Sequence, residues 1–328
     1  MLTFDFSGRV VIVTGAARGV GRVMVHAFAG AGAHVVAADR DEPGLTETCA
    51  AWAGLSVLPP AARATGERAP AVGERVVQVT ADISTAEGAN AIVGAAIEKF
   101  GRLDVCVNNA AVAPHAALLE ERVEVWDRVY AVNCRGTFLM TQAAARAMIA
   151  GQRGGRDDSS VSHDHASDDA SPPLLLGDES GRGFGPLAGG RIINFSSGVS
   201  QRGTAGAAAY ASSRAAVESF SRVAAIELAP YNILVNTVSP GLIDTQPKPL
   251  PPLMAENLSK RIPNLPLARP GESEEVASLV MFLASDASGY ISGAVINIDG
   301  ASSVGTRFSG SVVDVDPRYD WVTGKERS

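Results

Sequence analysis

The feature that most constrains the fold is a regular alternation of short Val- and Ile-rich runs with longer, Ala-rich stretches. The short runs are mostly continuous in apolar residues, as in strands that are covered on both faces. This alternation predicts a parallel sheet joined by crossover helices, an α/β fold with a single doubly wound domain and a parallel seven-stranded sheet. The expected strands are Val10–Thr14, His34–Ala38, Val76–Thr80, Leu103–Val107, Arg191–Phe195, Ile233–Val238 and Ala294–Ile298, and the expected helices are Gly21–Gly30, Thr85–Phe100, Val123–Ala150, Tyr210–Leu228 and Glu274–Ala284.

Three segments depart from this alternation and are expected to lie outside the core. Residues 54–73 contain prolines and follow no period, which predicts a loop extension. Residues 154–189 are rich in Ser, Asp, Gly and Pro, a composition typical of disorder because it offers little apolar surface. The expected catalytic domain therefore covers residues 1–302, interrupted by these two inserts, and residues 303–328 form a C-terminal tail.

The formal net charge of −7 comes from one segment of the chain. Of the 35 Asp and Glu residues, seven lie in 157–181, which has no Lys or Arg, so 28 acidic residues face 28 basic ones elsewhere. A neutral remainder indicates that the chain has no basic surface for nucleic acid. The acidity belongs to the second insert.

The sequence also excludes several other classes of protein. No apolar run reaches the roughly 18 residues of a membrane-spanning helix, and the first residues lack the basic stretch of a secretory signal. Cys49, Cys106 and Cys134 are too scattered for a disulfide framework or a zinc site. We expect a cytoplasmic protein with no metal and no membrane partner.

A glycine-rich turn follows the first expected strand and leads into a helix. It reads Thr14-Gly15-Ala16-Ala17-Arg18-Gly19-Val20-Gly21, with the spacing G-x-x-x-G-x-G. Glycines allow a tight turn, and a helix N-terminus attracts the pyrophosphate of a dinucleotide. The candidate contacts are Gly15, Arg18, Gly19, Val20 and Gly21. The alternative is a purely structural turn, but the order strand, turn, helix favours a nucleotide site.

Asp39 ends the second expected strand, eighteen residues after Gly21. A carboxylate here accepts the hydroxyls of the adenosine ribose and repels a 2′-phosphate. The alternative is a solvated acid, and the neighbouring Arg18 and Arg40 can attract a 2′-phosphate instead. We expect NAD as the cofactor, with NADP as the second candidate.

Further polar and small residues follow the third and fourth expected strands. They are Asp82 with Ile83, and Asn109 with Ala110. The carboxyl ends of parallel strands form the ligand-binding edge of an open α/β sheet, so these residues are candidate cofactor contacts. Ordinary turn chemistry is the alternative at each position.

The chemistry is expected from three side chains after the fifth strand. Ser197 lies two residues after that strand, and Tyr210 follows Ser197 by thirteen residues, at the start of a long helix. A tyrosine acts as a general acid or base when a nearby cation lowers its pKa, and a Ser hydroxyl can orient the reacting oxygen. Arg214 lies one helical turn after Tyr210, on the same face, and is the candidate cation.

These residues together resemble the short-chain dehydrogenase/reductase (SDR) family, in its classical branch. The motifs that carry the resemblance are Thr14–Gly21, Asn108-Asn109-Ala110, Asn133, Ser197, Tyr210 and Ser239-Pro240-Gly241. The resemblance implies a Rossmann fold and an NAD(P)-dependent oxidoreductase that interconverts a secondary alcohol and a ketone by hydride transfer.

The resemblance also implies a role for each matching residue. Ser197 is expected to hold the carbonyl oxygen, Tyr210 to exchange the proton, and Asn133 to anchor a water in the proton path. The residues expected beside the nicotinamide end of the cofactor are Tyr210, Arg214, Pro240, Gly241, Ile243 and Thr245.

The sequence departs from the family pattern at two positions. Arg214 stands where the family has Lys, and it keeps the positive charge but does not readily release a proton, because its pKa exceeds ~12. Ala111 stands where the family usually has Gly. The alternative function is therefore a catalytically impaired NAD-binding protein that acts as a sensor or partner subunit.

The substrate is expected to be a small, hydrophobic alcohol or ketone. Residues 242–270 are rich in Pro and are expected to form an apolar loop over the nicotinamide, although Lys248, Lys260 and Arg261 leave room for an acidic group. The resemblance further implies a homo-oligomer, a tetramer or dimer, that packs the helices around 131–150 and 210–228.

Overall fold

A computed structural model describes residues 4–54, 75–154, 189–245 and 252–305, together with two short paired strands, β10 (Tyr319–Asp320) and β11 (Lys325–Glu326). Almost all of the two expected inserts, and most of the expected tail, lie outside the described residues.

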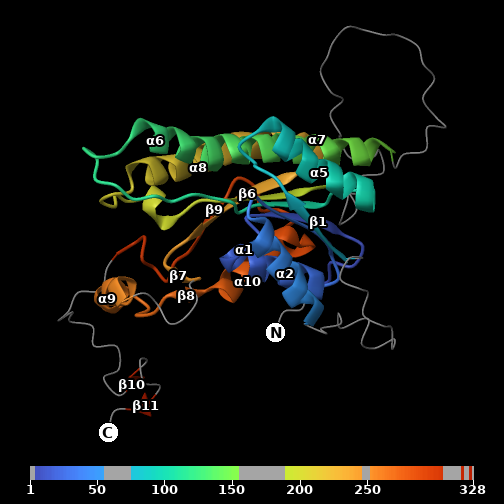
Figure 1. Ribbon diagram of the computed structural model, residues 1–328. Coiled ribbons are helices and arrows are strands. Elements are labelled where there is room, and N and C mark those ends of the chain that lie inside the picture. Colours follow the sequence, from blue (N-terminus) through green and yellow to red (C-terminus); the bar gives the residue numbers. More distant parts are fainter. Residues whose placement is uncertain are drawn as a thin grey trace.

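The core is a seven-stranded parallel sheet with the order β3-β2-β1-β4-β5-β6-β9 (Figure 1). The strands are β1 (Val10–Thr14), β2 (His34–Asp39), β3 (Val76–Thr80), β4 (Val105–Asn108), β5 (Arg191–Phe195), β6 (Leu234–Pro240) and β9 (Val295–Ile298). Each coincides, within two residues at either end, with a run expected from the sequence. The doubly wound α/β fold is therefore confirmed.

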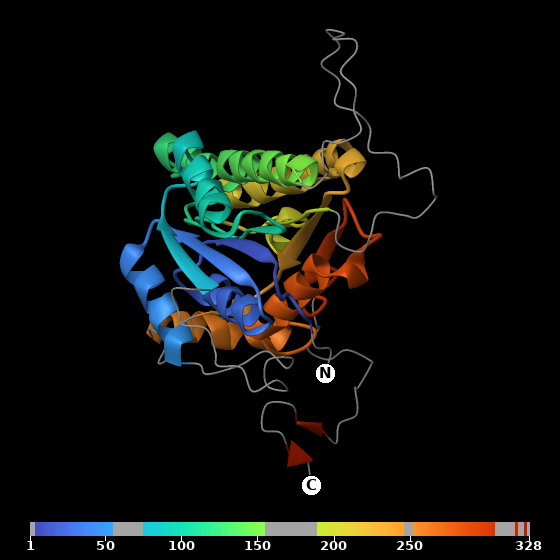
Figure 2. The same cartoon turned by 90° about the vertical axis from the view of Figure 1, so that its right-hand side faces the viewer.

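Helices cover both faces of the sheet, which is why its central strands are continuous in apolar residues (Figure 2). One face carries α1 (Gly19–Gly30), α2 (Glu42–Gly54) and α10 (Ser273–Ala284), whose side chains form a core with β1 and β2. The other face carries α5 (Ala86–Phe100), α7 (Thr137–Gly154) and α8 (Ala208–Leu228). Phe28 and Leu283 are fully buried in the first core, and Ile92 and Met140 in the second.

The long helix expected at Val123–Ala150 is interrupted. It consists of α6 (Val123–Tyr130), a π-helical turn (Ala131–Gly136) and α7. A π turn adds one residue to a helical turn and shifts the side chains that follow, and such turns often occur at functional sites. Asn133 lies inside this turn and is fully buried.

Two further segments contain elements that were not predicted from the sequence. Glu42–Gly54 forms α2, although Pro43 and Gly44 obscure its pattern, because Pro is tolerated in the first turn of a helix. Within the expected loop 242–270, the chain forms α9 (Pro252–Arg261) and a short parallel pair between β7 (Ile243–Asp244) and β8 (Gly271–Glu272).

The strand order places the ligand-binding edge at β1. This strand pairs with β2 on one side and with β4 on the other, so the chain leaves the centre of the sheet in opposite directions. In doubly wound folds such a switch point opens a crevice at the carboxyl ends of the strands. In the described part of the chain, no helix is long and apolar enough to cross a membrane.

Candidate active site

A cleft of about 1560 Å³ lies at the carboxyl ends of β1, β2, β3 and β4. Its lining includes thirteen of the residues expected from the sequence: Gly15, Arg18, Gly19, Val20, Gly21, Asp39, Arg40, Asp82, Ile83, Asn109, Ala110, Tyr210 and Thr245. It also includes Ala111, which departs from the family pattern, and Asp244, Glu272, Ser273 and Glu274, which sequence reasoning missed. These four residues belong to the β7–β8 pair and the start of α10. Both elements lie far from the glycine-rich turn in the sequence, and only the tertiary fold brings them to the cleft.

The glycine-rich turn packs tightly against the segment that follows β4. Gly15 has φ +69°, and a Cβ there would lie 2.7 Å from Nδ2 of Asn109. A Cβ on Gly21 would collide with the carbonyl oxygen of Gly15. The hydroxyl of Thr14 accepts hydrogen bonds from the backbone N–H groups of Asn109 (3.1 Å) and Ala110 (3.2 Å). The two glycines therefore let the turn pack closely against the segment after β4, at the N-terminus of α1.

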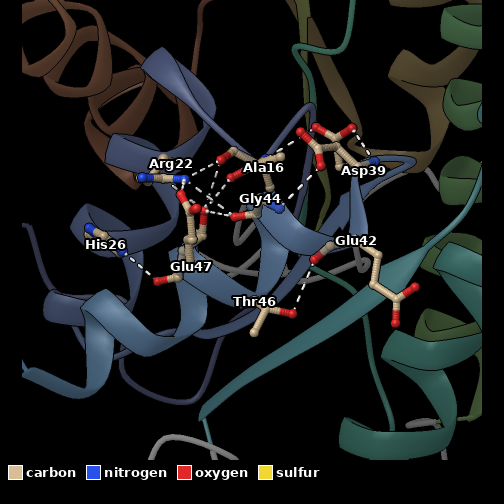
Figure 3. Close-up of polar contacts among 11 residues, drawn as sticks. Ala16, Arg22, His26, Asp39, Glu42, Gly44, Thr46 and Glu47 are labelled. Atoms are coloured by element: carbon tan, nitrogen blue, oxygen red, sulfur yellow. Dashed lines mark hydrogen bonds and ion pairs between the residues drawn. The ribbon is translucent and has the colours of Figure 1, made fainter. Parts of the chain in front are cut away.

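Asp39 is fixed by the backbone at the end of β2. One carboxylate oxygen accepts from Ala17 N–H at 3.1 Å, and the other accepts from the N–H groups of Arg40 at 2.7 Å and Asp41 at 3.1 Å (Figure 3). The bond to Ala17 joins the acid directly to the glycine-rich turn. Asp39 is only partly buried, so its carboxylate also faces the cleft.

Arg22 joins the same turn to α2, a contact that sequence reasoning missed. Its guanidinium donates to the carbonyl of Ala17 (2.6 Å) and to the hydroxyl of Thr48 (3.0 Å), and pairs with Glu47 (3.0 Å) (Figure 3). The Thr48 hydroxyl lies 2.9 Å from the carbonyl of Ala16. No sequence signal distinguishes Arg22 from a surface arginine, because its partners lie on a helix without a clear pattern.

Asp82 lies at the end of β3, in the wall of the cleft. Hydrogen bonds from the backbone and side chain of Ser84 hold its pKa below the usual value, and the charges of Arg40 and Arg128 add to this despite partial burial. Arg18 and Arg40 are both exposed at the cleft. The end of the cleft next to Asp39 and Asp82 thus combines two fixed carboxylates with two exposed cations.

Tyr210 lies at the start of α8, and its side chain meets those of Ser197 and Arg214. Burial raises the pKa of the Tyr210 phenol, but the charge of Arg214, with hydrogen bonding from Arg214 and Ser197, outweighs this and lowers the pKa below 10.0. The phenol is therefore more acidic than a free tyrosine, as a general acid or base at neutral pH requires.

Arg214 is buried behind Tyr210 and held in place. Only 3% of it is exposed, its Nη1 donates to the carbonyl of Phe195 at 2.8 Å, and its Cζ lies 5.2 Å from the centroid of the Tyr210 ring. Within the described residues its Nε has no hydrogen-bond partner. The guanidinium therefore supplies a fixed positive charge beside the phenol.

Six of the expected residues are not in the lining of the cleft: Asn133, Ser197, Arg214, Pro240, Gly241 and Ile243. The amide of Asn133 bonds both backbone groups of Val112 at 3.0 Å and donates to the Ser213 hydroxyl at 3.0 Å. It thus joins the π turn to α8 and to the segment after β4. Pro240 ends β6, Gly241 N–H donates to the carbonyl of Ile298 at 3.0 Å, and Ile243 belongs to β7.

The described part of the chain contains no group of three or more His, Cys, Asp or Glu side chains that could hold a metal ion. His163 and His165, in the acidic insert, lie outside it.

Comparisons with known proteins find relatives along most of the chain. The family model described as short chain dehydrogenase matches residues 9–156, and that described as enoyl-(acyl carrier protein) reductase matches residues 186–302. The chain is 32% identical to a trans-4-hydroxycyclohexanecarboxylate dehydrogenase of Sinomonas cyclohexanicum, over 90% of this chain and 93% of the relative. It is 33% identical to the 3-oxoacyl-(acyl-carrier-protein) reductase FabG of Thermotoga maritima, over 89% and 97%. A crystal structure of a short-chain type dehydrogenase/reductase from Mycobacterium marinum matches with a TM-score of 0.70 and 29% identity, over 91% and 97%.

Proposed function

The chain belongs to the short-chain dehydrogenase/reductase family of oxidoreductases, and on that basis we propose that it interconverts a secondary alcohol and a ketone with a nicotinamide cofactor. The observation that carries the proposal is the meeting of Tyr210, Ser197 and Arg214 beside the cleft. A protein that only binds a nucleotide has no chemical need for a phenol with a lowered pKa at that place.

The cleft fits a dinucleotide by its shape and its donors. Gly15, Gly19 and Gly21 line the cleft at the N-terminus of α1, where backbone N–H groups attract a pyrophosphate. We propose that Asp39 contacts the adenosine ribose, that Asp82 and Ile83 contact the adenine, and that Asn109 and Ala110 lie along the middle of the cofactor. Pro240, Gly241, Ile243 and Thr245 are proposed to lie beside the nicotinamide.

The bound cofactor supplies or accepts the hydride, and the side chains handle the oxygen and its proton. Ser197 donates a hydrogen bond to the substrate oxygen and orients it. Tyr210 gives a proton to that oxygen in reduction and removes it in oxidation. Arg214 stabilises the phenolate form of Tyr210, and because it stays protonated it relays no proton itself. Asn133 is proposed to anchor a water on the path by which the proton leaves.

The proposed cofactor is NAD, with NADP as the second candidate. Three backbone N–H groups hold the carboxylate of Asp39 in one orientation. The carboxylate therefore cannot rotate to make room for a 2′-phosphate. A carboxylate fixed in this position repels a 2′-phosphate and accepts hydrogen bonds from the ribose hydroxyls. The exposed Arg18 and Arg40 are the features that favour NADP.

The proposed substrate is a small, hydrophobic secondary alcohol or ketone, and the proposed assembly is a homo-oligomer. The name of the Sinomonas relative describes a hydroxyl on a cyclohexane ring that carries a carboxylate, which agrees with an apolar pocket that accepts one acidic group. Exposed apolar side chains on α7 and α8, Phe138 (42% exposed) and Ile226 (75%), support packing of these helices against another subunit.

One observation favours a second function. Arg214 replaces the family's lysine, and a chain that has lost the proton relay can persist as an NAD-binding sensor or partner subunit.

The test measures NAD- and NADP-linked turnover on a panel of hydrophobic secondary alcohols and ketones, together with cofactor binding by calorimetry. We expect NAD-dependent turnover in the wild type and a loss of about 100-fold or more in Tyr210→Phe, with cofactor affinity unchanged. Binding of NAD without turnover of any substrate, by wild type and Arg214→Lys alike, supports the second function instead.

A further inference from the structure

A carboxylate on α8 holds the turn that carries Ser197. Oε1 of Glu218 accepts hydrogen bonds from the hydroxyls of Ser196 at 2.6 Å and Ser200 at 2.5 Å. Ser196 is 3% exposed, and Glu218 is half-buried. The proposed reaction assigns no role to any of these three side chains.

The two serines lie on either side of Ser197, so one carboxylate oxygen closes the turn. The turn is the short 3₁₀ helix Gly198–Ser200, and the Ser200 hydroxyl also lies 2.8 Å from the carbonyl of Ser197. On its other side, Ser196 N–H donates to the carbonyl of Val238 at 2.8 Å. The backbone of Ser197 is thus held by β6 on one side and by Glu218, through the serine hydroxyls, on the other.

One face of α8 contacts the whole of this segment. Tyr210, Arg214 and Glu218 follow one another at intervals of four residues, which places them on the same face of the helix. Tyr210 meets the Ser197 side chain, Arg214 donates to the Phe195 carbonyl, and Glu218 accepts from the two flanking serines. The same helix, α8, therefore carries the phenol of Tyr210 and holds the turn around Ser197 in position.

We propose that Glu218 is a positioning residue, which acts through Ser196 and Ser200 to fix the Ser197 hydroxyl against the Tyr210 phenol. The inference rests on the proposed function, because it assigns Glu218 to the same reaction. A single oxygen that accepts from both ends of the turn limits the movement of Ser197, and a displacement of about 1 Å at a catalytic group can cost about 100-fold in rate.

The test compares Glu218→Leu, which removes the acceptor, with Glu218→Gln, which keeps an acceptor oxygen on a side chain of the same length. Glu227→Leu is the matched control, since Glu227 lies on the same helix and is exposed. We expect kcat to fall about 10- to 100-fold in Glu218→Leu, with the KM for cofactor changed less than about twofold. Glu218→Gln should recover kcat to within about threefold of the wild type, and Glu227→Leu should match the wild type.

A second readout does not depend on turnover. The phenol of Tyr210 is titrated by ultraviolet absorbance, as the difference between each protein and the same protein with Tyr210→Phe. Because hydrogen bonding from Ser197 lowers the pKa of Tyr210, loss of that contact in Glu218→Leu should raise it, and Glu218→Gln should restore it. This readout tests the inference even if no substrate is turned over, a result that would count against the proposed function alone.

Ser200→Ala and Ser196→Ala provide independent variants if Glu218→Leu does not fold. Each removes one of the two contacts and should lower kcat several-fold while raising the pKa of Tyr210. The proposal is overturned if Glu218→Leu, or both serine variants, keep the wild-type kcat and phenol titration, or if Glu218→Gln restores neither.

Discussion

The guanidinium of Arg214 lies over the ring of Tyr210, with Cζ 5.2 Å from the ring centroid, while its Nη1 donates to the carbonyl of Phe195 at 2.8 Å. The cation is therefore held against the phenol by the backbone at the end of β5. A planar, permanently charged group in this position stabilises a phenolate without exchanging a proton. Arg214 therefore supplies the positive charge but not the exchange of a proton, two roles that a lysine at this position would combine.

The first prediction concerns the charge of Arg214. Removing it in Arg214→Met should raise the pKa of Tyr210, since that charge helps to lower it. Alcohol oxidation requires the phenolate, so its rate rises with pH through this pKa, and the rising limb of the pH profile should move to higher pH. We expect a loss of about 100-fold or more at neutral pH. In Arg214→Lys, which keeps the charge, turnover should stay within about tenfold of the wild type; an unshifted profile in Arg214→Met would contradict the assignment.

The second prediction concerns Asp39 and cofactor choice. Asp39→Asn should weaken NAD binding about 10- to 100-fold, because hydrogen bonds to a charged group contribute about 1.5–3 kcal/mol, and should raise the preference for NADP relative to NAD. Calorimetric titration with both cofactors measures the ratio. Glu42→Gln is the control, since it removes one negative charge nearby on an exposed residue outside the lining of the cleft. If the ratio of the affinities for NAD and NADP is the same in Asp39→Asn and the wild type, the proposed contact of Asp39 with the ribose is wrong.

The third prediction concerns backbone strain before α10. Ala268 has φ +53°, a left-handed conformation that is unfavourable for a residue with a Cβ. Ala268→Gly should therefore raise the free energy of unfolding by up to about 1 kcal/mol. Ala91→Gly, at an exposed position inside α5, should lower it by about 1 kcal/mol. Denaturant unfolding of the three proteins checks both signs.

The fourth prediction concerns the pH dependence of the α10 cap. Hydrogen bonds from Arg269 and from the backbone of Glu272 lower the pKa of Glu275 to about 2. Because the pKa is lowered in the folded state, the stabilisation is complete above the unfolded value of 4.5 and is lost as the pH falls toward about 2. The pair is exposed, so Glu275→Gln should cost at most about 1 kcal/mol at pH 7. The thermal midpoints of the wild type and Glu275→Gln should therefore differ less at pH 4 than at pH 7.

The fifth prediction concerns the proposed oligomer. Ile226, on α8, is 75% exposed, and a charge there should prevent apolar packing between subunits. Ile226→Glu should reduce the molar mass measured by light scattering after size-exclusion chromatography. Ile97→Glu, on α5, should leave it unchanged. A wild type that is already monomeric would contradict the oligomer.

The sequence by itself determined the sheet and the order of the site residues along it. Strands such as β1 and β5 are local runs of Val, Ile and other residues that favour strands, and the glycine turn follows β1 directly, so a local pattern was enough to find both. The same holds for Tyr210 and Arg214, since a spacing of four residues in a helix places side chains on one face.

Only the tertiary structure decided which groups hold those residues in place. The bond from Ala17 N–H to Asp39, the contact of Arg22 with Thr48, and the bonds of two serines to Glu218 each join residues that are far apart in the sequence. No local periodicity indicates which of these residues will pair. Asn133, inside the π turn, likewise bonds Val112 and Ser213, which lie 21 and 80 residues away in the sequence. The physical reason is that periodicity reports which face of an element is buried, whereas a hydrogen bond between distant residues forms only after the chain has brought both partners within 3 Å or so of each other.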